Sequence, residues 1–187
     1  MLNYLNSITE DKSYVGLQMK EICPVMKLII RGKKREFLSA IGKSLNLLLP
    51  TESNTSSRSE KLTAIWLSPD EWMIYSNKTL NTDKNEYETE NLLNKNISKT
   101  NLGAVTDVTD QFVMINIKGD KIFDLFETGS PFNFNNFKNK KGAVIQTILA
   151  KIDVIIHNEN QHEVNLFVRR SFSQHLFSWM SDSASRL

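Results

Sequence analysis

The sequence predicts an α+β fold: mainly antiparallel sheets with helices, built as two related strand-strand-helix subdomains. Short runs of β-branched and aromatic residues are spread along the chain, and only a few segments show helical apolar spacing. One pattern also occurs twice. A strand ends in a basic residue and a glycine, Gly32 or Gly119, a short helix follows, and a second glycine, Gly42 or Gly129, comes ten residues later. A duplicated unit would leave this repeat.

Length and composition favour one cytoplasmic domain over residues 1–187, of which 1–13 are polar and aperiodic and are expected to form a loose arm. The 23 basic and 21 acidic residues give a net charge of +2, which argues against a nucleic-acid partner. No run approaches the roughly 20 apolar residues that cross a membrane. Cys23 is the only cysteine, so an intrachain disulfide is excluded.

The first half of the chain predicts two strands, a helix and a loop. Alternating apolar residues indicate strands at 15–19 and 26–30. From Lys33 to Leu49 the apolar residues recur at offsets of four, four and three, which is typical of an amphipathic helix. The serine- and threonine-rich segment 51–60 is expected to be a loop.

A β-hairpin is expected next. Residues 64–67 and 72–75 are rich in β-branched and aromatic side chains, and Ser68-Pro69-Asp70 supplies the turn between them. Trp66 and Trp72 would bring a large apolar area into this hairpin.

The second half repeats the order of strands and helices and ends in a helix that begins after the candidate N-cap Ser171. Its apolar stripe is Phe172, Leu176, Trp179 and Met180. The other expected elements are helices at 85–99 and 120–127 and strands at 105–110, 112–117, 143–151, 152–157 and 163–168.

No catalytic, cofactor-binding or metal-binding set emerges from the residues. The three histidines lack a further ligand at metal-binding spacing, and Cys23 has no neighbouring histidine in the sequence. Asp107 and Asp110 could form an acid-base pair. We favour turns in which these side chains accept backbone N–H bonds.

Five residues are candidates for contact with a partner. Phe132, Phe134 and Phe137 are spaced through an asparagine-rich loop, where they could cover this chain's own core or, as we slightly prefer, dock on another chain. Arg169 and Arg170 precede the last helix, at the end that disfavours positive charge. They could pair with an internal carboxylate such as Asp107, which we favour, or with a partner subunit.

The hairpin carries a family resemblance. Trp66-Leu67-Ser68-Pro69-Asp70-Glu71-Trp72 resembles the W-L-G-P-D-E-W signature of the gamma subunit of heterotetrameric sarcosine oxidase, with Ser68 where glycine is usual. Further matches occur in order between about Val15 and Trp179: Arg31-Gly32, Val105–Asp110, Gly142–Thr147, and Arg169-Arg170-Ser171-Phe172 with Leu176 and Trp179.

The resemblance implies a fold similar to the folate-binding domain of the glycine-cleavage T-protein. It implies a non-catalytic subunit with alpha, beta and delta subunits as partners, in a complex that oxidises sarcosine to glycine and yields hydrogen peroxide and methylenetetrahydrofolate. FAD, FMN, NAD and tetrahydrofolate would be held by the other subunits, and this chain would hold no cofactor.

Two other functions stay open. The first is a free-standing folate-binding enzyme of the aminomethyltransferase type, in which Asp107 or Asp110 would orient the pterin. The second is a binding or regulatory module unrelated to amine oxidation. The sequence does not separate sarcosine from a related N-methyl amine as the substrate of the complex.

Overall fold

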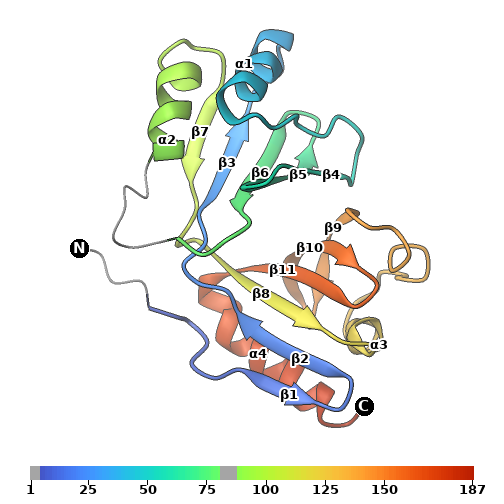
Figure 1. Cartoon of the computed structure of the whole chain (residues 1–187). Helices are drawn as coiled ribbons and strands as arrows, with labels where there is room; N and C mark the ends of the chain where they lie inside the picture. Colours follow the sequence, from blue (N-terminus) through green and yellow to red (C-terminus); the bar gives the residue numbers. More distant parts are fainter. Residues whose placement is uncertain (1–4, 81–87) are drawn as a thin grey trace. The chain divides into compact units, whose positions relative to one another are not determined.

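Two antiparallel sheets organise the computed structural model, which describes residues 5–80 and 88–187 (Figure 1). Each sheet belongs to its own compact unit. Pro24–Thr109 form one, which we name the continuous unit, and Met1–Cys23 with Asp110–Leu187 form the other, which we name the split unit. Together they carry four α-helices within the described residues, so the predicted α+β class is confirmed.

The continuous unit has a five-stranded sheet in the order β4-β5-β6-β3-β7. The predicted hairpin is confirmed: its two strands pair Trp66 with Trp72, and the register shifts between Trp66 and Ser68. The predicted helix after the second strand is also present. The elements are β3 (Lys27–Arg31), α1 (Arg35–Leu45), β4 (Ser56–Arg58), β5 (Leu62–Ser68), β6 (Glu71–Ser76), α2 (Glu88–Leu93), the π-helical turn η1 (Asn94–Ser98) and β7 (Ala104–Asp107).

Phe37 and Trp72 are buried next to each other in the core of the continuous unit. Their ring centroids are 5.9 Å apart, and the Trp72 indole Nε1 donates to the Pro50 carbonyl at 2.7 Å. Two glycines lie against the Phe37 ring, since a Cβ on Gly32 would come within 2.5 Å of it and one on Gly103 within 2.7 Å. The indole is therefore buried with its polar atom satisfied.

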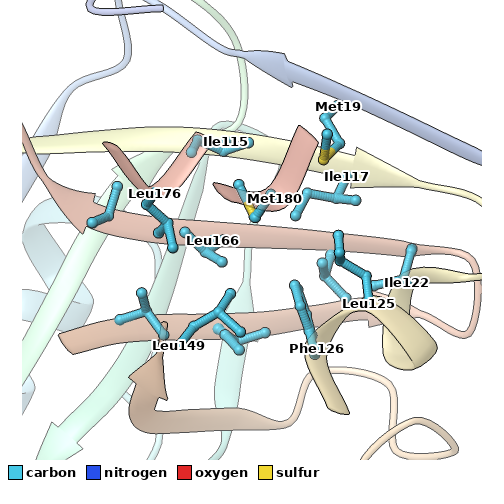
Figure 2. Packing of buried hydrophobic residues seen from close by; sticks show 14 of the residues in the cluster. Met19, Ile115, Ile117, Ile122, Leu125, Phe126, Leu149, Leu166, Leu176 and Met180 are labelled. Carbon is cyan, nitrogen blue, oxygen red and sulfur yellow. The ribbon is translucent and has the colours of Figure 1, made fainter. Parts of the chain in front are cut away.

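The split unit has a six-stranded sheet in the order β1-β2-β8-β11-β10-β9. Figure 2 shows Leu176 and Met180 of its last helix among strand side chains such as Ile115 and Leu166, in one buried cluster. The elements are β1 (Lys12–Tyr14), β2 (Leu17–Glu21), β8 (Phe112–Lys118), α3 (Ile122–Glu127), β9 (Val144–Leu149), β10 (Ile152–Asn160), β11 (Glu163–Arg169) and α4 (Arg170–Ala184).

The two sheets have the same topology. In each unit a first strand leads into a helix, three antiparallel strands follow, and the last of these pairs with the first strand. The far side of the first strand is occupied by β7 in the continuous unit and by the N-terminal β2 in the split unit. The repeat expected from the sequence therefore corresponds to two related subdomains.

The predicted loose arm needs correction. Residues 1–4 lie outside the described residues, but Ile8 is buried and its N–H donates to the Glu21 carboxylate at 2.7 Å. Ser7 bonds Ser173 of α4 at 2.5 Å, and β1 begins at Lys12. Contacts with α4 and β2 hold the described part of the arm in place. These contacts join residues far apart in the sequence, so the polar composition of the arm does not predict them.

Three further predictions differ from the structure. Part of the segment 51–60 forms the short strand β4. Pairing with β5 stabilises this extended backbone, which its polar residues alone do not favour. The helix predicted at 85–99 becomes α2 and η1, and its residues 85–87 lie outside the described residues. Ser171 is not an N-cap, since α4 begins at Arg170 without a side-chain cap, and Phe172 is 48% exposed outside the buried stripe.

Candidate functional site

The Arg170 side chain makes its contacts within the split unit. Its Nε donates to the Asp110 carbonyl at 3.0 Å and its Nη1 to the Leu5 carbonyl at 3.1 Å, while Nη2 lies 3.6 Å from Asp110 Oδ1. Internal pairing was expected, but with Asp107 as the example. Asp107 instead accepts the Thr109 N–H at 2.8 Å, as the turn interpretation predicts. Which carboxylate meets the arginine depends on tertiary folding, because both lie on the same short segment.

Arg169 has a different environment. It is exposed at the end of β11 and lines a groove of about 480 Å³ on the sheet of the split unit, which we name the β9 groove. Arg169 and Asp153 bring opposite charges to this groove, beside apolar residues such as Phe112. Its walls come from Phe112, Gln146, Thr147, Ile148, Asp153, Val154, Ile155, Phe167 and Arg169.

The preferred interface role of the phenylalanine loop is wrong for two of its three rings. Phe134 is fully buried and Phe137 is 6% exposed, both in the core of the split unit. Phe132 is half buried against the same core. The ring centroid of Phe134 lies 4.9 Å from that of Phe132 and 5.9 Å from that of Phe137. Phe134 and Phe137 both pack against Phe123 of the short helix α3, so they are not available to a partner.

Asn158 fixes the backbone of that loop. It is fully buried, and its Nδ2 donates to the carbonyls of Phe137 at 2.8 Å, Lys140 at 3.0 Å and Lys138 at 3.3 Å. Its backbone carbonyl accepts the Gly142 N–H at 2.7 Å. One side chain therefore binds three carbonyls of the loop, and two of these carbonyls, those of Phe137 and Lys140, also accept backbone N–H groups.

A chain of polar side chains crosses three strands of the split unit. Asn116 donates to Glu163 at 3.0 Å and to Asn165 at 2.9 Å, and Asn165 donates to Glu159 at 2.9 Å. His157 Nδ1 lies 3.6 Å from that Glu159 carboxylate. Partial burial alone would raise the pKa of Glu163, but hydrogen bonds from Lys118 and Asn116 outweigh it, so the pKa lies below 4.5. The chain of bonds keeps these polar groups satisfied.

The family-like hairpin turn meets the end of β3. Arg31 lies 3.5 Å and Lys33 3.7 Å from Asp70, and the Gly32 N–H donates to the Asp70 carbonyl at 3.0 Å. A hydrogen bond from the Ser68 hydroxyl at 2.9 Å is the main cause of a lowered Asp70 pKa, with a smaller contribution from Arg31. Two segments that match the family, Arg31-Gly32 and the hairpin, thus contact each other in the continuous unit.

The histidines and acids are dispersed. Across residues 5–80 and 88–187, no group of three His, Cys, Asp or Glu residues could hold a metal ion. His162 pairs with Asp120 at 2.7 Å, and His175 is exposed on α4. None of the described helices is long and apolar enough to span a bilayer.

The β9 groove is the feature that sequence reasoning missed. The sequence predicts a strand at 143–151, in which the run Val144–Leu149 contains no charged residue. The position of this run at the end of the sheet, and the groove that Arg169 lines, depend on pairing between distant strands, which the sequence does not specify. The lack of charged residues in Val144–Leu149 is the sequence feature that could have drawn attention to this strand.

Two solved structures share the fold. Heterotetrameric sarcosine oxidase from Corynebacterium sp. U-96, in complex with pyrrole 2-carboxylate, matches with a TM-score of 0.77 and 18% identity, over 91% of this chain and 84% of that chain. The glycine cleavage system aminomethyltransferase T from Bartonella henselae matches with a TM-score of 0.63 and 12% identity, over 90% of this chain and 46% of that chain. A search of curated proteins found no match.

The sequence itself gives the family. Residues 32–186 match the profile described as the sarcosine oxidase, gamma subunit family. The matched range includes the hairpin, both glycine repeats and the whole of the last helix, and thus parts of both units. The chain belongs to the sarcosine oxidase gamma subunit family.

Proposed function

We propose that this chain is a non-catalytic subunit of a complex that oxidises sarcosine to glycine, with hydrogen peroxide and methylenetetrahydrofolate as products. The observation that carries the proposal is the family match over residues 32–186. The fold shared with a heterotetrameric sarcosine oxidase over 91% of this chain is consistent with it.

In this proposal the chain contributes a rigid surface, while the chemistry belongs to its partners. Alpha, beta and delta subunits would hold FAD, FMN, NAD and tetrahydrofolate. Arg169 remains a candidate for subunit contact because its side chain is exposed. Arg170 is a weaker candidate, since its guanidinium already binds Asp110 and Leu5.

The experiment is purification of the chain with an affinity tag at native expression, followed by an absorption spectrum and a sarcosine oxidation assay of the eluate. We expect other subunits to co-purify with flavin absorbance and with sarcosine-dependent formation of hydrogen peroxide. Sarcosine and other N-methyl amines, compared as substrates, would identify the preferred amine.

The non-catalytic role is tested on the same complex. The substitution Asp107→Asn keeps an acceptor for the Thr109 N–H but removes the carboxylate that a pterin-orienting role would need. We expect an unchanged kcat per assembled complex and an unchanged yield of methylenetetrahydrofolate. A large loss of that yield in a fully assembled complex would contradict the role.

The aminomethyltransferase-like alternative predicts another result. A colourless chain that purifies alone and binds tetrahydrofolate in a titration would replace the subunit proposal. The shared fold with aminomethyltransferase T makes this the second function to test, although this chain spans 46% of that protein.

A further inference from the structure

We propose that β9 accepts an extended segment of another subunit as an additional strand, and that this segment carries acidic residues at its two ends. The inference rests on the proposed function, because it requires that the chain assembles with other subunits. It assigns a contact surface to the split unit and a chemistry to its partner.

The first observation is that β9 differs from the other sheet ends. Each sheet ends in two edge strands, and β1, β4 and β7 are only three or four residues long and contain Lys12, Arg58 and Asp107 respectively. The edge strand β9 has six residues, Val144–Leu149, without charge, proline or glycine. Long uncharged edges invite pairing with another strand, and proteins usually protect them. An edge left in this form is therefore a candidate for use.

The second observation is the direction of the backbone groups of β9. The hairpin to β10 has a two-residue turn, Ala150-Lys151, whose φ values of 51° and 66° are typical of a type I′ turn, and Leu149 pairs with Ile152 next to it. Hydrogen-bonding directions alternate along a strand, so the N–H and C=O groups of Ile148 point away from β10. In the part of the chain that the structure describes, no strand lies on that outer side.

The third observation is that the β9 groove begins at this edge. Ile148 is 40% exposed and lines the groove with Ile155, Phe112 and Arg169. Alternate side chains of an added strand would lie on the same face of the sheet as Ile148. The added strand would therefore place apolar or small polar side chains beside the groove, as strand addition elsewhere combines backbone bonds with side-chain pockets.

The charges around β9 select the occupant. Lys138, Lys140 and Lys141 are exposed shortly before the strand, and Lys151 is exposed directly after it. A second copy of β9 would bring lysines to lysines, because both ends of the strand are basic and either pairing direction joins like charges. A partner segment with Asp or Glu at both ends would meet opposite charges and gain orientation from them.

Amide hydrogen exchange on the isolated chain and on the purified complex tests the inference. We expect protection of the Ile148 amide to rise about tenfold or more on assembly, because a strand partner would accept its N–H. Amides of β10 serve as the internal control, since that strand already has a neighbour on each side. A complex that contains the other subunits but leaves exchange in β9 unchanged would overturn the inference and leave the proposed function standing.

Substitutions separate the backbone from the charges. Ile148→Pro removes an N–H that points away from β10, and we expect it to lower the co-purified subunits about tenfold, while Ile148→Val leaves them unchanged. Ile148→Lys, which keeps the backbone intact, is the second variant in case the proline variant unfolds. Circular dichroism and thermal unfolding of each variant verify that it has folded.

The charge requirement has its own control. The combined variant Lys138→Glu, Lys140→Glu and Lys141→Glu should weaken assembly more at low salt than at high salt. Lys43→Glu on α1 is exposed as well and should leave assembly unchanged. Equal effects of both variants would contradict a role for the lysines beside β9.

The remaining outcomes have distinct meanings. A chain that co-purifies no subunit would refute the proposed function and remove the basis of the inference. An isolated chain that dimerises, with protected β9 amides in the dimer, would identify a second copy as the occupant and overturn the assignment to another subunit. Sedimentation of the isolated chain distinguishes these two results.

Discussion

The two units build the same sheet and fill the space beside it differently. In the continuous unit the first strand is followed by the eleven-residue helix α1, which buries Phe37 and Ile41. In the split unit the corresponding helix α3 has six residues, and the loop that follows inserts Phe134 and Phe137 into the same core. The two units thus share the same strand pairing, but different elements supply the side chains that fill their cores.

A second likeness supports this comparison. Arg31 pairs across the strands with Glu71, and Lys118 with Glu163, each where the first strand ends and the last strand of the three begins. In the split unit this pair forms a contact of 3.0 Å, whereas Arg31 lies near Asp70 instead. Equivalent positions therefore keep opposite charges but not the same partner atoms.

Removal of the indole should have the largest effect on the continuous unit. Trp72→Ala should lower the free energy of unfolding by about 3–5 kcal/mol, because it opens a cavity and leaves the Pro50 carbonyl without its donor. Chemical denaturation measures this loss. Hydrogen exchange then tests the comparison: equal acceleration in both units would mean that they unfold together.

In the split unit, the matching change is in the phenylalanine loop after α3, whereas Trp72 lies in strand β6. Phe134→Ala should lower the free energy of unfolding by about 3–4 kcal/mol, because the ring is fully buried against four other phenylalanines. Asn136→Ala, at an exposed position of the same loop, should change it by less than about 0.5 kcal/mol. A stable Phe134→Ala variant that fails only in assembly would restore the interface interpretation.

Replacement of the repeated glycines by alanine should change stability in opposite directions in the two units. In Gly129→Ala the new Cβ would lie 2.4 Å from the Trp179 ring, so we expect a loss of about 1–3 kcal/mol. In Gly42→Ala the nearest atom is at 3.7 Å and the site is inside α1, so we expect a gain of about 0.5–1 kcal/mol. Thermal unfolding of the two variants measures both. The same sign for both would show that the glycines have equivalent roles.

The smallest expected effect concerns the charged pair of the split unit. Because the pKa of Glu163 lies below 4.5 in the folded chain, its carboxylate stabilises the fold above pH 4.5, and this contribution is lost as the pH falls through the lower folded value. Glu163→Gln should flatten the dependence of stability on pH in that acidic range. Asp124→Asn, at an exposed position of α3, is the control and should leave the shape of the curve unchanged.

The sequence predicted what local periodicity and turn chemistry determine. The hairpin, α1, β8 and the last helix follow from apolar spacing and from the Ser-Pro-Asp turn, and the repeated strand-helix pattern revealed the two related subdomains. The strand β4 could not be predicted, because its polar residues become a strand only through pairing with β5.

The candidate site was less predictable, since it depends on contacts between distant residues. Phe132, Phe134 and Phe137 have no strand or helix period, so nothing in their spacing separates the interior from the surface. Arg170 could have met either of two nearby carboxylates. Family membership, in contrast, was readable from the hairpin motif and the order of the other matches.

The split unit imposes an order on synthesis. The continuous unit has emerged completely by Thr109, whereas β2 waits for β8, which begins at Phe112, and the sheet is not complete before β11 ends at Arg169. Domains generally fold as units while the ribosome extends the chain. The continuous unit can therefore fold first during translation, whereas β2, although it is synthesised before that unit, pairs with β8 only after the unit is complete.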